Sequence, residues 1–177
     1  MPSDHDTPPG PRQRPLSQAT AEKVFRTDYS RVQYAIVDFL ADHLADTSRA
    51  FGGDLQQALL LAIIGQAQLA AMLGPAAEPR DDGGIERRGM TAARLADATG
   101  IARETVRRKL LALQAQGWIE RDGSAWCLVL RGDNAAARVD LAGVDDRGIT
   151  RAARLFARLA AVATPPGRER RPDRPDG

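Results

Sequence analysis

The part of this 177-residue chain that most constrains its fold is residues 90–130, MTAARLADATGIARETVRRKLLALQAQGWIERDGSAWCLVL. Apolar residues recur at helical spacing before and after Gly100, which predicts two short helices joined by a tight turn. Glycine adopts a left-handed backbone at little cost, so Gly100 suits the end of the first helix. The first helix is expected over 91–99, with the hydroxyl of Thr91 as its cap, and the second over 103–116.

A β-hairpin is predicted directly after the second helix. Asp122-Gly123 lies between two runs of strand-forming residues, which is a strong hairpin signal. The first strand is expected over 117–120 and the second over 125–130, with 121–124 at the tip. Helix, turn, helix and hairpin together make a winged helix-turn-helix. Most other segments predict helices, so the expected fold class is mainly α.

The second helix has two different faces. Val106, Leu110 and Leu113 form its buried stripe, at spacings of four and three residues. At about 100° per residue, Glu104 and Arg108 point almost directly away from Val106. Arginine can pair with guanine, glutamate can accept from cytosine, and threonine can reach a phosphate or a thymine methyl group. This face therefore predicts contact with the major groove of double-stranded DNA.

The same residues carry a resemblance to a known family. Residues 91–119 resemble the winged helix-turn-helix of bacterial transcription regulators, most closely the cyclic-AMP receptor protein (Crp) group. The matching features are Gly100 in the turn, Ala96 four residues before it, and the run Arg-Glu-Thr-Val at 103–106, followed by Arg108.

The resemblance implies roles for individual residues. In that family the counterparts of Arg103, Glu104 and Arg108 contact base pairs, and those of Thr91 and Thr105 contact phosphates. Arg107 flanks this face of the helix. Arg121 ends the first wing strand, from which it can reach phosphates or the minor groove. The predicted DNA-binding residues are Thr91, Arg103, Glu104, Thr105, Arg107, Arg108 and Arg121.

Three features depart from the family pattern. Ala102 stands where a capping serine is usual, and Lys109 stands where an apolar residue is common. No cyclic-nucleotide jelly roll is predicted before the motif, so effector binding of the Crp type does not carry over. Any small-molecule effector is unknown.

Two other functions compete with DNA recognition. A helix-turn-helix can dock a protein, and arginine-rich helix faces are usually only solvated. The chain could therefore be an adaptor that binds a partner protein through its winged helix. It could also be a ligand-gated sensor with a pocket in the helical region 17–74.

Composition limits the remaining functions. With 25 Lys+Arg against 23 Asp+Glu, a DNA-binding footprint must come from the local clustering of arginine in and beside the motif. The single cysteine, Cys127, excludes a disulfide framework and is expected as a buried thiol. His5 and His43 are far apart in sequence, so neither a metal nor a cofactor is predicted. No nucleophile set or phosphate loop is found, so no catalytic residues and no enzyme activity are expected.

The helical region before the motif is predicted to form a homodimer. One long helix is expected over 17–46, and a second helix, apolar almost all round, over 55–73. Interior glutamines and marginal length argue against a membrane span, and the lack of a signal-peptide pattern favours the cytoplasm. One side of helix 55–73 is expected to pack on the first helix and the other on a second copy, with an ordinary core helix as the alternative. The predicted dimer-interface residues are Leu59, Leu60, Ile63 and Ala67.

A last helix is expected from about Arg147 to Ala163. Its spacing predicts that Ile149 and Phe156 face inward, against the wing domain or a dimer partner, and that Arg151, Arg154 and Arg158 face outward. A second DNA-contacting surface is the alternative, and which helical segment forms the dimer is open. The predicted organisation is a disordered tail (1–16), a dimerisation region (17–74), a linker (75–89), the winged helix-turn-helix (90–131), a C-terminal extension (132–164) and a second disordered tail (165–177).

Overall fold

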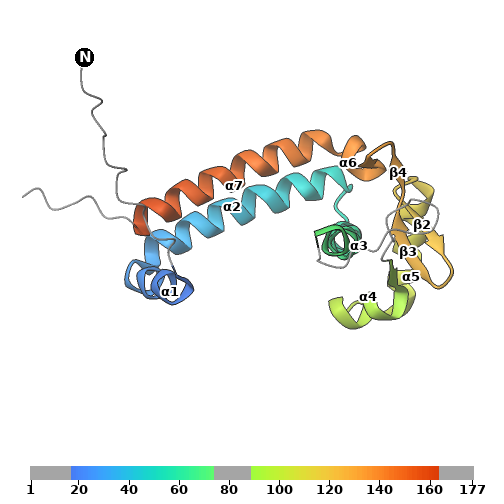
Figure 1. Ribbon diagram of the computed structural model, residues 1–177, viewed down its shortest axis with the longest axis horizontal. Helices are drawn as coiled ribbons and strands as arrows, with labels where there is room; N and C mark the ends of the chain where they lie inside the picture. The colour runs from blue at the N-terminus through green and yellow to red at the C-terminus, as the bar shows by residue number, and fades with distance from the viewer. Residues whose placement is uncertain (1–16, 74–88, 164–177) are drawn as a thin grey trace, which may run out of the picture. The chain divides into compact units, whose positions relative to one another are not determined.

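The structure, a computed structural model, describes residues 17–73 and 89–163 (Figure 1). It has the predicted fold class, mainly α with small antiparallel sheets. The helices are α1 (Gln18–Thr27), α2 (Tyr29–Ala50), α3 (Leu55–Leu73), α4 (Ala92–Thr99), α5 (Arg103–Ala115), α6 (Ala136–Asp140) and α7 (Ala142–Ala163). The strands are β1 (Met90–Thr91), β2 (Ile119–Asp122), β3 (Ala125–Leu128), β4 (Leu130–Arg131) and β5 (Asn134–Ala135).

Contacts divide the chain into two compact units. The winged-helix unit is Phe39–Ala153, and the terminal unit combines Met1–Asp38 with Arg154–Gly177. The domain boundaries predicted from the sequence, at residues 74 and 89, differ from the boundaries of these two units. The predicted linker and both predicted tails lie almost wholly outside the described residues.

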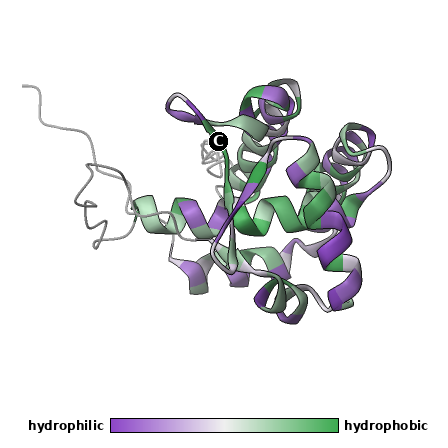
Figure 2. Ribbon diagram, turned by 90° about the vertical axis from the view of Figure 1, so that its right-hand side faces the viewer, coloured by the Kyte–Doolittle hydropathy of each residue, from purple (hydrophilic) through white to green (hydrophobic). Residues whose placement is uncertain are grey.

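The core of the winged-helix unit is formed by α3, α4, α5 and the three-stranded sheet. Leu60 and Ile64 of α3 are fully buried in it, together with Leu95 of α4 and Leu110 of α5. α3 is hydrophobic along most of its length, and its length and composition would also suit a membrane span (Figure 2). Because its buried residues belong to the core, α3 is part of the winged helix in this structure.

The wing is shorter at its tip than predicted. Asp122 pairs with Ala125 across β2 and β3, so the loop is Gly123-Ser124 rather than residues 121–124. Gly123 has φ +57° at the first loop position, where a type II′ turn takes glycine. The second strand ends at Leu128 instead of Leu130, because β4 pairs with β5 in a separate hairpin.

The sheet has a third strand, which the sequence did not predict. β1 pairs with β3, with Met90 opposite Trp126, so the strand order is β1-β3-β2. Gly89 precedes β1, and a Cβ at this position would lie only 2.6 Å from the Sγ of Cys127. A glycine is required there for the close approach of the chain to β3.

Two predicted helices have different bounds. The helix expected over 17–46 is broken at Asp28 into α1 and α2, and α2 continues to Ala50. Asp28 ends α1 with a non-helical backbone of φ −113° and ψ 46°, and its N–H donates to the carbonyl of Val24. The last helix, α7, begins at Ala142 rather than near Arg147.

The predicted faces of α7 are correct for Arg154, which is exposed, and wrong for several other residues. In the winged-helix unit, Arg151 donates to Asp46 of α2 at 2.9 Å. In the terminal unit, Arg158 donates to Asp38 of α2 at 2.6 Å. Ile149 and Phe156, predicted to face inward, are 67% and 75% exposed. Hydrophobic periodicity identified the apolar side of α7 correctly, but long arginine side chains make the contacts with α2.

Candidate nucleic-acid interface

The turn between α4 and α5 is set by local hydrogen bonds. The side chain of Thr91 caps α4 by accepting from the N–H of Arg94 at 3.3 Å. Gly100 ends α4 with φ +69°, and its N–H donates to the carbonyl of Ala96 at 2.8 Å. Ile101 is half-buried against the core and anchors the angle between the helices. The predicted cap and left-handed glycine are both confirmed.

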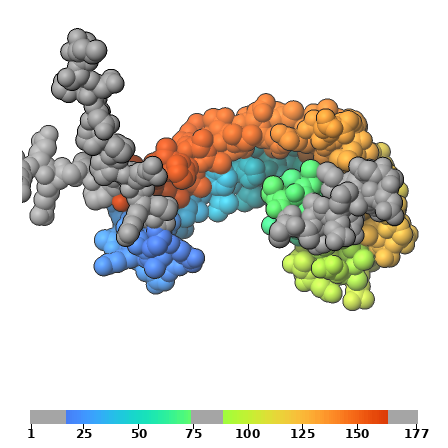
Figure 3. Space-filling view, in the orientation of Figure 1, coloured from blue at the N-terminus to red at the C-terminus, as the bar shows by residue number. Residues whose placement is uncertain are grey.

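The start of α5 lies open on the surface of the winged-helix unit (Figure 3). Val106, Leu110 and Leu113 are fully buried, as predicted from their spacing. Ala102, the N-cap residue, provides no side-chain hydrogen bond to the helix. The amphipathic stripe therefore orients α5, with its opposite face directed to solvent.

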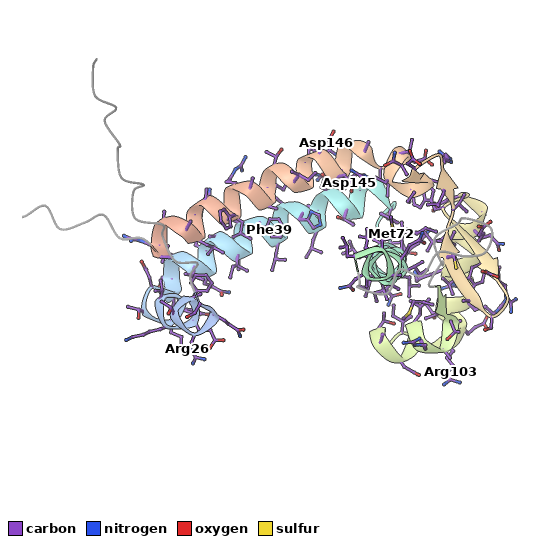
Figure 4. All side chains as sticks on the ribbon, in the orientation of Figure 1. Arg26, Phe39, Met72, Arg103, Asp145 and Asp146 are labelled. Atoms are coloured by element: carbon purple, nitrogen blue, oxygen red, sulfur yellow. The ribbon has the colours of Figure 1, made fainter. Side chains whose placement is uncertain are left out.

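Most of the predicted DNA-binding residues are brought together on this open face. Arg103, Glu104, Arg107 and Arg108 are exposed on α5, and Arg103 projects outward from its start (Figure 4). Thr105 beside them is half-buried, and so is Thr91 at the start of α4. The arrangement presents three arginines, one carboxylate and the hydroxyl group of Thr105 on a single helix that could enter a groove.

Residues 67–131 match the family model of the Crp-like helix-turn-helix domain. This segment is a Crp-like helix-turn-helix domain. The match covers 65 of the 177 residues and supports a role in DNA-binding transcription regulation. No curated protein and no solved structure matches the chain. The match begins inside α3, whereas the packing of Leu60 and Ile64 extends the domain core towards the start of that helix.

Carboxylates hold two arginines of the Crp-like domain. Arg107 binds Glu104 through two nitrogens, with Nη2 at 2.7 Å from Oε1 and Nε at 3.0 Å from Oε2. The hydrogen bonds and the charge of Arg107 hold the pKa of Glu104 below its ordinary value, and the nearby charge of Arg108 acts in the same direction. Arg103 lies 3.9 Å from Asp97 of α4, a weaker pair in which both side chains are largely exposed.

Polar contacts that the sequence did not predict tie α5 to the beginning of α3. Asp54 caps α3 by accepting from the N–H of Gln57 at 2.9 Å, and it also accepts from Lys109 of α5 at 2.6 Å. Burial acts to raise the pKa of Asp54, but the hydrogen bonds from Lys109 and Gln57 outweigh it, and this pKa is lowered. The side chain of Gln57 donates to that of Gln116 at 3.0 Å. Lys109, which departs from the family pattern, is thus a structural residue.

The wing presents one predicted DNA-binding residue. Arg121 is exposed, and its Nε donates to the carbonyl of Gly123 at 3.0 Å, which folds the guanidinium over the loop. Behind the wing, Asp140 of α6 accepts from the indole of Trp118 at 2.8 Å and from Arg131 at 2.5 Å. These bonds fasten α6 to the hairpins.

The predicted dimer-interface residues occupy different environments on α3. Leu60 is fully buried among residues of its own chain, so it offers no surface to a partner. Ile63 and Ala67 are half-buried, and Leu59 is 45% exposed. Further apolar residues that the sequence did not single out for an interface, Leu55, Leu69 and Leu73, are also exposed.

Two observations concern sites for small ligands in the described part of the chain. No group of three or more possible metal ligands occurs among residues 17–73 and 89–163. A shallow hollow of about 360 Å³ lies in the terminal unit, lined by Ser30, Arg31, Tyr34, Ala35, Arg158 and Val162. Both of its charged residues are already paired, Arg31 with Asp28 and Arg158 with Asp38. Arg158 also lies 6.0 Å from the ring centre of Tyr34. None of its lining residues is a predicted DNA-binding residue.

Proposed function

We propose that the protein regulates transcription by binding a two-fold symmetric DNA site as a homodimer, with α5 of each copy in the major groove. The observation that carries this proposal is the division of α5 into two faces. Val106, Leu110 and Leu113 anchor the helix in the core, while charged side chains occupy the exposed opposite side. A helix held in this way can present side chains to base edges without losing its packing.

Individual roles follow from side-chain chemistry. Arg103 and Arg108 can each make two hydrogen bonds to guanine, and Glu104 can accept from the amino group of cytosine. Thr91 accepts from Arg94, yet its own O–H remains a donor for a phosphate oxygen. Thr105 and Arg121 are further proposed DNA-contacting residues, and Arg107 lies beside them on the same surface. As a bacterial DNA-binding protein, the chain acts in the cytoplasm.

The proposed dimer surface is the outward side of α3. Exposed residues on this side follow one another at steps of four, three, four, three and four: Leu55, Leu59, Ala62, Gln66, Leu69 and Leu73. At about 100° per residue this stripe lies opposite Leu60 and Ile64, and its spacing is that of a coiled-coil seam. The order of these steps is the same from either end of α3. The stripe of one copy can therefore pack against the same stripe of a second copy. Ile63 lies beside the seam, and Ala67 lies further round the helix, towards Leu60.

DNA recognition is tested by selecting bound fragments of the source genome at physiological salt and titrating single-base variants of the selected site. We expect Arg108→Ala to cost about 1–3 kcal/mol on the preferred site and to relax preference at one position. The control is Arg138→Ala, an exposed arginine of α6, which should change neither affinity nor preference. If Arg108→Ala keeps the wild-type preference while folded, α5 does not contact bases. Binding to a protein, insensitive to salt, would then favour the adaptor function.

The dimer is tested by sedimentation at tens of micromolar protein. Leu59→Asp and Leu69→Asp place an unpaired charge in the seam and should give monomers, because neither side chain is needed in the core. Gln56→Asp, on an exposed position of α3 outside the stripe, should leave the dimer intact. A monomeric wild type would overturn the proposed dimer.

A further inference from the structure

Glu104 and Arg107 contact each other directly. Separate contacts of each residue with DNA would not explain this pairing. Arg107 makes three hydrogen-bond contacts with Glu104, at 2.7, 3.0 and 3.2 Å. Both side chains are exposed, so neither packing nor burial forces them together. The guanidinium and the carboxylate meet in the two-pronged geometry that fixes the plane of both groups.

An acid on a DNA-contacting helix meets repulsion from the phosphates. Several features around Glu104 counter it. The residue lies in the first turn of α5, where the helix dipole favours a negative charge. Arg107 and Arg108 both stabilise the ionised form and lower the pKa of the carboxyl group. Glu104 is therefore kept ionised as a hydrogen-bond acceptor.

Acceptor capacity remains after Arg107 is bound. A carboxylate has about four lone-pair positions, and the fork of an arginine occupies about two of them. The remaining positions can accept the amino hydrogen of a base, with the carboxylate plane already fixed. A free glutamate side chain would have to lose rotational freedom when it meets the base.

We propose that Arg107 is a positioning residue, which orients the carboxylate of Glu104 for one base and thereby sets the preference at that base pair. This inference rests on the proposed contact of α5 with the major groove. It differs from a direct contact between Arg107 and a phosphate. A phosphate contact would supply affinity for all sequences alike, whereas a positioned acid supplies discrimination.

A first experiment tests the pair without DNA. Carboxyl signals of the full-length protein are followed by NMR during a pH titration, with Arg107→Ala and Arg107→Lys beside the wild type. Arg107→Ala should raise the pKa of Glu104 towards the ordinary value of a glutamate. Arg107→Lys should raise it by less, because lysine keeps the charge but lacks the planar fork. An unchanged titration in Arg107→Ala would overturn the inference, whatever DNA binding shows.

A second experiment compares base preferences in Arg107→Ala, Arg107→Lys, Glu104→Ala and the double alanine variant. Discrimination at one base pair should fall roughly fivefold to 150-fold in Glu104→Ala, the range expected for one good base contact. Arg107→Ala should lose much of the discrimination at the same base pair. The double variant should discriminate no worse than Glu104→Ala. Arg107→Lys should keep the salt dependence of binding yet fail to restore the preference.

The opposite pattern would identify a phosphate contact. Arg107→Ala would then weaken binding to every sequence equally, lower the salt slope by about one unit, and be rescued by lysine. A loss of preference at a different base pair would mean that Arg107 contacts a base itself, and it would also overturn the inference. If neither the wild type nor any variant prefers one DNA sequence over another, the proposed function is wrong, whatever the role of Arg107. Melting temperatures should match throughout, because the side chains are exposed.

Discussion

Two parts of the winged-helix unit are stabilised by different interactions. The Crp-like domain is built on a continuous apolar core, in which buried residues from α3, α4, α5 and the sheet contact one another. The contact between α2 and α7 is ionic: the buried carboxylate of Asp46 accepts from Arg147 at 2.8 and 3.0 Å and from Arg151 at 2.9 Å. α7 contributes no buried residue at all.

This difference sets how each part should respond to its surroundings. Apolar burial is insensitive to salt and fixes one packing arrangement, because removing a side chain leaves a cavity. Ion pairs weaken as salt rises or as the carboxylate is protonated, and partly exposed pairs are worth little individually. The domain that binds DNA is therefore expected to stay folded under conditions that separate α7 from α2.

The largest loss of stability should come from a substitution that leaves a cavity in the core. Leu110 is fully buried on α5, while its neighbour Leu111 is 45% exposed. Leu110→Ala should lower the free energy of unfolding by about 2–5 kcal/mol, because it loses burial and leaves a cavity. The matched change Leu111→Ala should lower it much less. Urea denaturation followed by tryptophan fluorescence measures both, since Trp118 and Trp126 belong to the same core.

Sequence patterns succeeded where neighbours in the chain determine the structure. The bounds of α3, the left-handed Gly100 and the buried stripe of α5 all follow from local spacing or from the needs of one backbone position. The pairing of Met90 with Trp126 and the bond between Lys109 and Asp54 join residues far apart in sequence. Such partners cannot be inferred from periodicity.

The outward arginines predicted for α7 show a second reason for failure. Periodicity separates an apolar side from a charged side, but it does not say which side faces a neighbour. Asp46 of α2 offers a buried carboxylate to Arg147 and Arg151, and this decides the orientation of α7 in the winged-helix unit. Similarly, the almost uniform apolarity of α3 indicated burial without revealing that Leu60 faces the core and Leu59 the solvent.

A smaller and more local effect should come from removing the charge that holds α7. Asp46→Asn keeps the size of the side chain but loses the ion pairs, so amide hydrogen exchange of residues 142–153 should become faster. Exchange in α5 should not change, because its protection depends on the apolar core. Asp42→Asn, an exposed carboxylate one turn earlier in α2, is the control. Faster exchange throughout α5 would show that the two parts open together.

Acid should reproduce this opening in the wild type. Hydrogen bonds from Arg147 and Arg151 hold the pKa of Asp46 far below its ordinary value, and this outweighs the effect of burial. A carboxyl group with a depressed folded pKa contributes stability that is complete above the unfolded pKa of about 3.9 and declines as pH falls below it. Exchange or circular dichroism below about pH 4 should therefore show loss of the contact between α2 and α7. Asp46→Asn should lack this component, and an identical acid response in both proteins would contradict the assignment.

The smallest loss of stability is expected at α6, which lies between the wing and α7 in the chain. Trp118 donates through its indole nitrogen to Asp140 at 2.8 Å, while its ring packs edge-on against Phe51 at 5.5 Å between ring centres. Trp118→Phe keeps an aromatic ring beside Phe51 but loses the hydrogen bond, which should cost about 0.5–1.5 kcal/mol. Asp140 also accepts from Arg131, so its carboxylate retains a partner and the cost should stay at the lower end. Asp140→Asn, which keeps an oxygen acceptor, should cost less still by urea denaturation. Ala136 and Ala137 of α6 are buried in the same core, so the hydrogen bond adds to an apolar attachment of α6. A loss in Trp118→Phe as large as that in Leu110→Ala would contradict this.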